Sequence, residues 1–233
     1  MRPHLMTSGA FLIAATAVSA EERTYDLTGF DAVEVSAGIT ANVTVGADYG
    51  VVGEAIKGDI ENLDIVQVGT QLMISRETDR SWGLIGLLRK DDRFVVTVTL
   101  PELTAVDGNS GASVDVVGAT TALLQAEASS GASLDITGAD LGEISLEATS
   151  GASLTISGAC DAVAAQATSG ASLSARKLTC SAATLDASSG ASLSAYADTT
   201  ATVEASSGAS LSVRGGADVT EQSVSSGASV SIR

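Results

Sequence analysis

The stretch Ser150-Gly151-Ala152-Ser153-Leu154-Thr155-Ile156 decides the fold, because its opening tetrapeptide, Ser-Gly-Ala-Ser, recurs along the second half of the chain. Successive copies are spaced 20, 20, 19, 20, 18 and 19 residues apart. A nearly constant period of this length is typical of solenoids. The seven copies are centred on Gly111, Gly131, Gly151, Gly170, Gly190, Gly208 and Gly227.

Apolar residues alternate with polar ones after each copy of the tetrapeptide, as at Leu134 and Ile136 or at Leu154 and Ile156. A period of two residues predicts β-strands. Glycines such as Gly138 and Gly158 predict a turn between strands, so that each unit should contain two or three short strands. The sequence therefore predicts an all-β fold, a right-handed parallel β-helix (β-solenoid) whose ~20-residue coils stack about 4.8 Å apart.

The first half resembles the same solenoid with less regularity. Strand patterns occur at 33–35, 39–45, 72–74 and 94–100, and Pro101 marks a strand end. We expect one domain over residues 29–233, after a leader at 21–28. Its coils should be irregular over 29–105, with a charged loop at 76–93, and regular over 106–233.

The N-terminus has the features of a signal peptide. Arg2 and His4 precede an apolar run over residues 9–18, and small residues end at Ala20, after which we expect cleavage. A buried first helix is the alternative. The run is too short to span a bilayer, so we expect no transmembrane anchor. The protein is thus predicted to be exported to the periplasm, to the cell surface or into the medium of a bacterium.

Four motifs carry a family resemblance. They are Gly29-Phe30-Asp31-Ala32-Val33, Ala37-Gly38-Ile39, Leu72-Met73-Ile74 and Val98-Thr99-Leu100-Pro101, and they lead into the Ser-Gly-Ala coils. From Asp26 onward the chain resembles the bacterial "putative auto-transporter adhesin, head GIN domain" family. The resemblance implies an exported β-helical domain, and the family has no established catalytic residues to carry over.

Composition limits the function. Acidic residues outnumber basic ones 28 to 12, giving a net charge of −16, and this disfavours nucleic acid as a partner. The one histidine is His4, so the mature chain lacks Ser-His-Asp and Cys-His catalysis and histidine-based metal sites. We expect no cofactor and a non-enzymatic binding or adhesion module of the envelope or the secreted fraction. A polysaccharide-active enzyme or a glycan-binding β-helix is the alternative.

Two sets of polar residues recur in the coils. An acidic column lies four residues before the repeat glycines and is interpreted as a solvated stripe or a divalent-cation site. A hydroxyl face lies two and four residues after them and is interpreted as a solvated face, a glycan or surface contact, or an ice-binding face. The acidic column comprises Asp107, Glu127, Glu147, Gln166, Asp186 and Glu204. The hydroxyl face comprises Ser133, Ser153, Thr155, Ser172, Ser174, Ser192, Ser194, Ser210 and Ser212.

Cys160 and Cys180 each lie nine residues before the serine of a repeat, so they occupy the same position in adjacent coils. We therefore predict a disulfide between them, with two free thiols as the alternative.

A second candidate contact is the apolar loop around the only tryptophan, which basic residues surround. It is either a docking loop for a protein or membrane surface, or a lid folded over the solenoid. Its residues are Trp82, Leu84, Ile85, Leu87, Leu88, Arg89 and Lys90.

Overall fold

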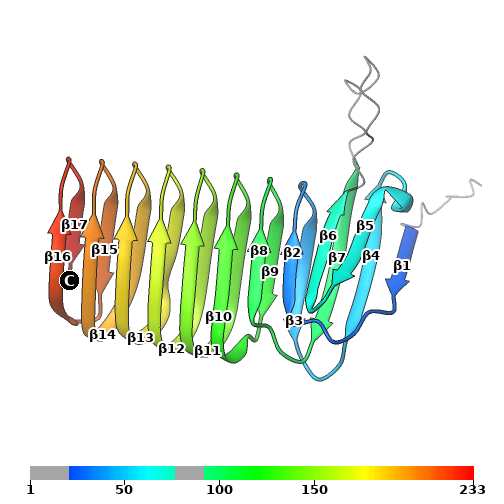
Figure 1. Ribbon diagram of the computed structural model, residues 1–233, viewed down its shortest axis with the longest axis horizontal. Helices are drawn as coiled ribbons and strands as arrows, with labels where there is room; N and C mark the ends of the chain where they lie inside the picture. Colours follow the sequence, from blue (N-terminus) through cyan, green and yellow to red (C-terminus); the bar gives the residue numbers. More distant parts are fainter. Residues whose placement is uncertain (1–20, 77–91) are drawn as a thin grey trace, which may run out of the picture.

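A computed structural model describes residues 21–76 and 92–233. The chain winds into a right-handed solenoid, with stacked coils running from the N-terminal strands at one end to the C-terminus at the other (Figure 1). The described residues form parallel stacked strands in coils of about twenty residues, and they contain no α-helix. The predicted fold class is therefore confirmed.

Each regular coil contributes one strand segment to each of two facing sheets. The segments that follow the Ser-Gly turns form one sheet, and the segments that precede the turns form the other. Four strands, β11 to β14, run continuously through the corner between the sheets. The regular strands are β8 (Ala105–Gly108), β9 (Ser113–Val117), β10 (Thr120–Ala128), β11 (Ser133–Ala148), β12 (Ser153–Ala167), β13 (Ser172–Ala187), β14 (Ser192–Ala205), β15 (Ser210–Arg214), β16 (Asp218–Val224) and β17 (Ser229–Ile232).

The Ser-Gly step forms the tight turn between the sheets. Ser150 and Gly151 both have positive φ, 52° and 73°. The N–H of Ala152 donates to the carbonyl of Thr149 at 3.0 Å. Two consecutive positive φ angles within such a closed turn define type I′, which favours glycine. The turns also bond to one another, because the N–H of Gly151 donates to the carbonyl of Ser169 in the next turn at 3.1 Å.

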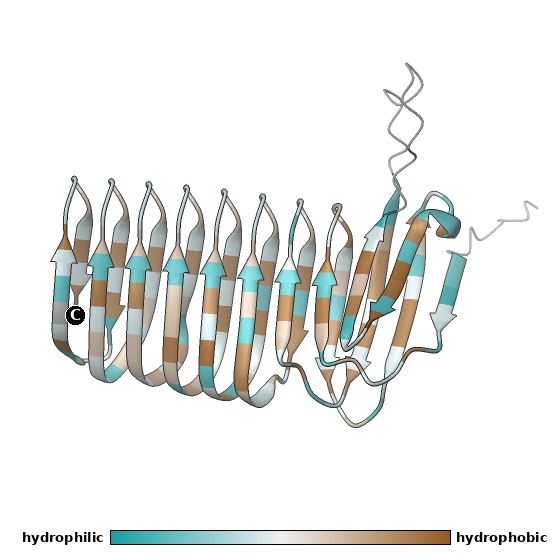
Figure 2. Cartoon of the chain, in the orientation of Figure 1, coloured by the Kyte–Doolittle hydropathy of each residue, from teal (hydrophilic) through white to brown (hydrophobic). Residues whose placement is uncertain are grey.

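Equivalent residues of successive coils lie side by side, so the core is a set of aliphatic columns. Leu134 pairs with Leu154, and Leu154 pairs with Leu173. These three leucines are all buried. Figure 2 shows the resulting alternation of apolar and polar residues along the strands. Among the described residues no polar or charged side chain is fully buried, so hydrophobic packing and backbone ladders hold the coils together.

The N-terminal coils do not follow sequence order. β2 (Ala32–Val35) lies between β6 (Gln71–Arg76) and β8, and β3 (Thr40–Val45) lies between β7 (Arg93–Leu100) and β9. In sequence order, the chain first forms the coil of β2 and β3. It then forms β6 and β7, which pair with one side of that coil, and finally β8 and β9, which pair with the other side. The strand expected to end before Pro101 ends at Leu100.

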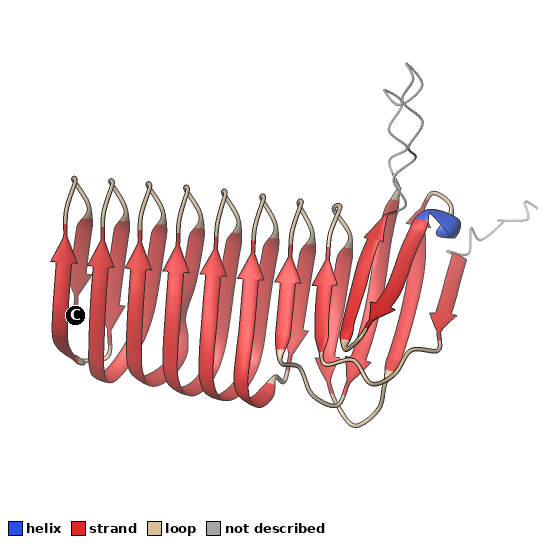
Figure 3. Cartoon of the chain, in the orientation of Figure 1, coloured by secondary structure: helices blue, strands red, loops and turns tan. Residues whose placement is uncertain are grey.

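Antiparallel strands cover the N-terminal end of the solenoid (Figure 3). β4 (Gly50–Lys57) pairs with both β7 and β1 (Glu21–Tyr25), and β5 (Leu63–Val68) pairs with β6. A short 3₁₀ helix, η1 (Ile60–Asn62), joins β4 to β5, and Arg23 of β1 forms an ion pair with Glu61 of η1. These antiparallel strands were not predicted from the sequence.

Candidate functional site

The two sheets of the solenoid present different chemistry to solvent. The sheet built from β9, the opening segments of β11 to β14, β15 and β17 carries the predicted hydroxyl residues in two columns, and we call its outer surface the hydroxyl face. The first column is Ser113, Ser133, Ser153, Ser172, Ser192, Ser210 and Ser229. The second column is Asp115, Asp135, Thr155, Ser174, Ser194, Ser212 and Ser231.

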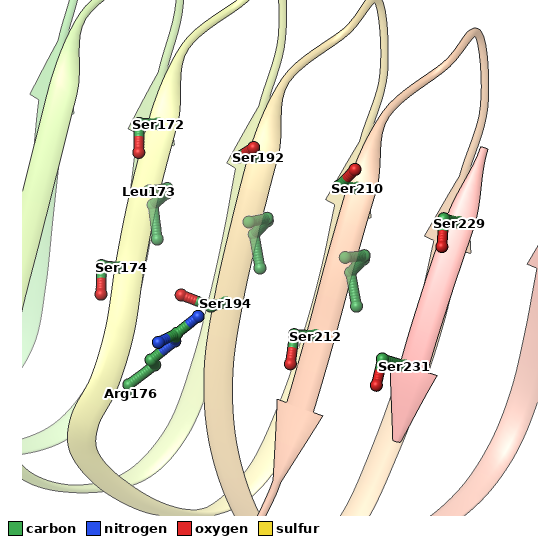
Figure 4. Close-up of a pocket in the computed structure, with 12 residues that line it drawn as sticks. Ser172, Leu173, Ser174, Arg176, Ser192, Ser194, Ser210, Ser212, Ser229 and Ser231 are labelled. Carbon is green, nitrogen blue, oxygen red and sulfur yellow. The ribbon is translucent and has the colours of Figure 1, made fainter. Parts of the chain in front are cut away.

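The hydroxyl face is hollowed over the last four coils into a shallow groove of about 400 Å³ (Figure 4). The predicted Ser133, Ser153 and Thr155 lie on the same face but outside the groove lining. The lining combines small hydroxyl side chains with leucines and one arginine. It comprises Ser172, Leu173, Ser174, Arg176, Ser192, Leu193, Ser194, Ser210, Leu211, Ser212, Ser229 and Ser231.

The serine side chains of the groove form no hydrogen bonds within the described part of the chain. The strand backbones satisfy their own donors and acceptors in the ladder, whereas none of these serine side chains hydrogen-bonds to another described residue. Each hydroxyl offers one donor and two acceptor lone pairs. The groove is therefore a rigid array of unused hydroxyl groups at the spacing of the coils.

One edge of the groove is basic. β13 contains an irregularity, because Ala175 pairs with Ala195 but Thr179 is the next residue to pair, with Tyr196. Arg176 and Lys177 fall in this irregular segment and are exposed. Strand irregularities of this kind re-aim side chains beside functional sites. In Figure 4 the Arg176 side chain extends along the groove toward Ser194.

The following coils continue this edge. Tyr196 pairs with Arg214. Arg233 follows β17, and its N–H donates to the carbonyl of Val213, which places it beside Arg214. The sequence analysis missed Arg214 and Arg233. The signal was present, because Arg176, Tyr196, Arg214 and Arg233 each lie six residues after a repeat glycine.

The acidic column lies on the opposite sheet and extends to Glu34, since Glu34 pairs with Asp107 and Asp107 with Glu127. Its side chains are exposed or half-buried, as the alternation predicted. Burial raises the pKa of Asp107 to about 6, and the adjacent Glu127 and Glu34 carboxylates add to the shift. One Asp107 oxygen lacks a hydrogen-bond partner among the described residues, while Glu34 accepts from Gln71 at 3.0 Å and Asn109 at 3.3 Å.

No group of three or more histidine, cysteine or carboxylate side chains within residues 21–76 and 92–233 is arranged to hold a metal ion. The column therefore gives no support to the divalent-cation interpretation. Its carboxylates instead make this sheet the acidic face of the solenoid.

The predicted disulfide is present. Cys160 and Cys180 pair in register in β12 and β13 and are bonded, with a Cα–Cα distance of 4.6 Å. Both side chains are buried in the core. The bond links two adjacent coils, the second of which carries the first arginine of the groove.

The remaining predictions concern residues outside the described part of the chain. The signal peptide at 1–20 and the loop residues Trp82, Leu84, Ile85, Leu87, Leu88, Arg89 and Lys90 all lie there. Within the described residues no helix has the length and hydropathy needed to cross a membrane.

A right-handed solenoid of stacked parallel strands defines the β-helical class of proteins, and comparison with known proteins agrees with this class. Residues 29–217 match the family described as "Putative auto-transporter adhesin, head GIN domain". The chain belongs to this family, as the sequence motifs indicated. No curated protein matches the sequence.

Solved bacterial structures share the fold at low sequence identity. A "putative adhesin" from Bacteroides fragilis NCTC 9343 has a TM-score of 0.76 and 14% identity, covering 93% of this chain and 97% of that one. A "putative lipid binding protein" from Parabacteroides distasonis ATCC 8503 has a TM-score of 0.72 and 11% identity, covering 93% and 98%. A "putative adhesin" from Parabacteroides merdae ATCC 43184 has a TM-score of 0.69 and 10% identity, covering 93% and 97%.

Proposed function

We propose that this protein is a non-enzymatic binding module of the bacterial envelope or the secreted fraction, and that it contacts its partner through the hydroxyl face. The observation that carries the proposal is the groove of unpaired serine hydroxyls on a rigid parallel sheet. Such an array binds a repetitive surface at low entropic cost, because its side chains are short and have little rotamer freedom to lose.

Three observations support export. The N-terminal sequence has signal-peptide features, the family is one of adhesins, and adjacent coils are joined by a disulfide, which persists in oxidising compartments. We therefore place the protein in the periplasm, on the surface or in the medium. Cell fractionation with surface protease digestion tests this placement. Recovery of intact protein with its N-terminal segment in the cytoplasm contradicts it.

The lining of the groove favours binding over hydrolysis. Glycoside hydrolysis uses a pair of carboxylates flanking the bond to be cleaved. The groove beside Arg176 is lined by serines, leucines and that arginine, without a carboxylate among the described residues. The polysaccharide-active enzyme, the alternative that the sequence left open, therefore gains no support from this groove, whereas a glycan-binding face does.

Retention on isolated envelopes tests the contact surface. We would compare residues 21–233 with the double variant Ser174→Asp/Ser194→Asp, since these side chains are only partly buried and line the groove. Ala164→Asp/Thr184→Asp, which changes two exposed, register-paired positions of adjacent coils on the opposite sheet, is the matched control. We expect retention to fall at least tenfold for the groove variant and to stay unchanged for the control. Equal retention of all three proteins would show that the hydroxyl face is not the contact.

A further inference from the structure

The basic residues of the regular coils are gathered at a single place. Residues 106–233 contain four lysine and arginine side chains, Arg176, Lys177, Arg214 and Arg233, and all of them are exposed. Arg176 lines the groove, and Arg214 and Arg233 each lie two residues after the second hydroxyl column in their coils. The protein as a whole carries a net charge of −16. A basic edge in so acidic a chain is a local feature that the overall composition does not explain.

Within the part of the chain that the structure describes, none of these four basic side chains forms an ion pair. Asp198 and Asp218, which follow the corner in the neighbouring coils, form no such contact with them. The guanidinium groups of Arg176 and Arg214 therefore keep their planar sets of donors available for a bidentate anion.

The hydroxyl face changes character along the solenoid. Its second column carries carboxylates at Asp115 and Asp135 in the earlier coils and hydroxyls from Thr155 onward. The basic edge begins one coil later, at Arg176. An anion lying along the last four coils therefore meets hydroxyls and arginines and avoids the carboxylates of the same face.

The acidic column does not cancel this local field. It lies on the opposite sheet, and packed sheets are about 10 Å apart. The Debye length at physiological ionic strength is about 8 Å, so charges on the far face are largely screened at the groove. The electrostatic attraction of a ligand to the hydroxyl face therefore depends mainly on the arginines beside it.

We propose that the groove binds a linear acidic glycan, with the sugar hydroxyls on the serine columns and the sugar carboxylates on Arg176, Arg214 and Arg233. This inference rests on the proposed function and names its ligand class. A linear glycan fits because the site is itself linear and repeats at each coil, about every 4.8 Å. Tyr196 is half-buried between the first two arginine coils and offers a ring against which a sugar can pack.

Calorimetric titration of residues 21–233 tests the assignment with two probes of equal length, oligogalacturonate and neutral galacto-oligosaccharide. We expect the acidic probe to bind at least tenfold more tightly. Arg176→Gln and Arg214→Gln should each weaken it about tenfold, the effect of losing one charge-assisted interaction. Arg93→Gln removes an exposed arginine of β7 away from the groove and should change nothing.

The outcomes separate this inference from the proposed function. Equal affinity for both probes, with no effect of the arginine variants, overturns the acidic glycan and leaves the hydroxyl face as a neutral contact. Binding of oligogalacturonate that Arg93→Gln weakens as much as Arg176→Gln shows non-specific charge attraction only, and also overturns it. Failure of both oligosaccharides to bind, together with unchanged envelope retention of Ser174→Asp/Ser194→Asp, overturns both proposals.

Discussion

Two glycines of one coil are required for different physical reasons. Gly151, at the Ser-Gly turn, has a φ of 73°, and a Cβ added there would point into open space. Gly158, at the corner between the sheets, has a φ of 142°, and a Cβ there would clash with the carbonyl oxygen of Ala139 in the preceding coil. The first glycine relieves backbone strain, and the second allows two backbones to approach closely.

Alanine substitution separates these two roles. We expect Gly151→Ala to lower the free energy of unfolding by about 1 kcal/mol, because it adds left-handed strain without a clash. Gly158→Ala should cost at least about 3 kcal/mol, because the rigid neighbouring backbone cannot move aside. Urea titration monitored by circular dichroism measures both values. Equal losses for the two variants would contradict the distinction.

Asp107 makes stability depend on pH. Its pKa rises from an ordinary value of 3.8 to about 6 on folding, so the folded state binds the proton more tightly than the unfolded chain. The protein therefore loses stability as pH rises from about 4 to about 6, and above that the loss is constant. We expect Asp107→Asn to raise the melting temperature at pH 8 and to have little effect at pH 3.5.

The control for this prediction is Glu147→Gln, an exposed member of the same column. Its effect at pH 8 should be smaller, since water solvates the carboxylate in the folded state. Melting curves of the unchanged protein, Asp107→Asn and Glu147→Gln at pH 3.5 and pH 8 test the prediction. A stabilisation by Asp107→Asn that is the same at pH 3.5 and pH 8 would rule out the charge of Asp107 as its cause.

At the scale of single elements, the disulfide links β12 to β13 across a sequence separation of 20 residues. A loop of that length predicts a stabilisation of about 3 kcal/mol, mainly by restricting the unfolded chain. Reduction, or the double variant Cys160→Ala/Cys180→Ala, should lower the free energy of unfolding by this amount. Urea titration with and without reductant measures it. The double variant is the control, and any sensitivity of its stability to reductant would show that the effect has another origin.

The regular strands could be predicted from the sequence because a fixed period aligns their residues. Leu134, Leu154 and Leu173 share one core column. Because side chains alternate along a strand, this column determines which of the residues between them point into the core and which point to solvent. The same alignment places Cys160 beside Cys180. The hydroxyl columns followed from the same alignment. The basic edge was not predicted, because the coil between those of Arg176 and Arg214 carries Tyr196 at the equivalent sequence position, six residues after the repeat glycine.

At the scale of the whole molecule, the N-terminal end could not be predicted. Placing β2 between β6 and β8 brings together segments that are far apart in sequence and share no repeat. Strand pairing of that kind depends on long-range packing rather than on local pattern. The antiparallel β1 and β4, which cover the end of the solenoid, left no periodic signal for the same reason.

Whole-coil deletion tests the modular construction of the molecule. Removing residues 133–152 joins Ala132 to Ser153, which places Ser153 opposite Ser113 in the register that Ser133 now occupies. We expect a folded protein shortened by about 5 Å, the spacing of one coil. Removing residues 133–142 instead shifts a strand to the wrong sheet and should abolish folding. Circular dichroism and small-angle scattering measure both, and a half-coil deletion as well folded as the whole-coil deletion would contradict the argument.

The recurrent Ser-Gly turn also has a consequence for inheritance. The coils share the Ser-Gly-Ala-Ser tetrapeptide and a period of 18 to 20 residues, so duplication or deletion of the gene segment for one coil adds or removes that coil as one unit. Since each turn bonds to the next through the same glycine N–H and serine carbonyl, an inserted coil finds its partners on both sides. A lineage can therefore lengthen or shorten the hydroxyl face in steps of about 4.8 Å while the covered N-terminal end stays unchanged.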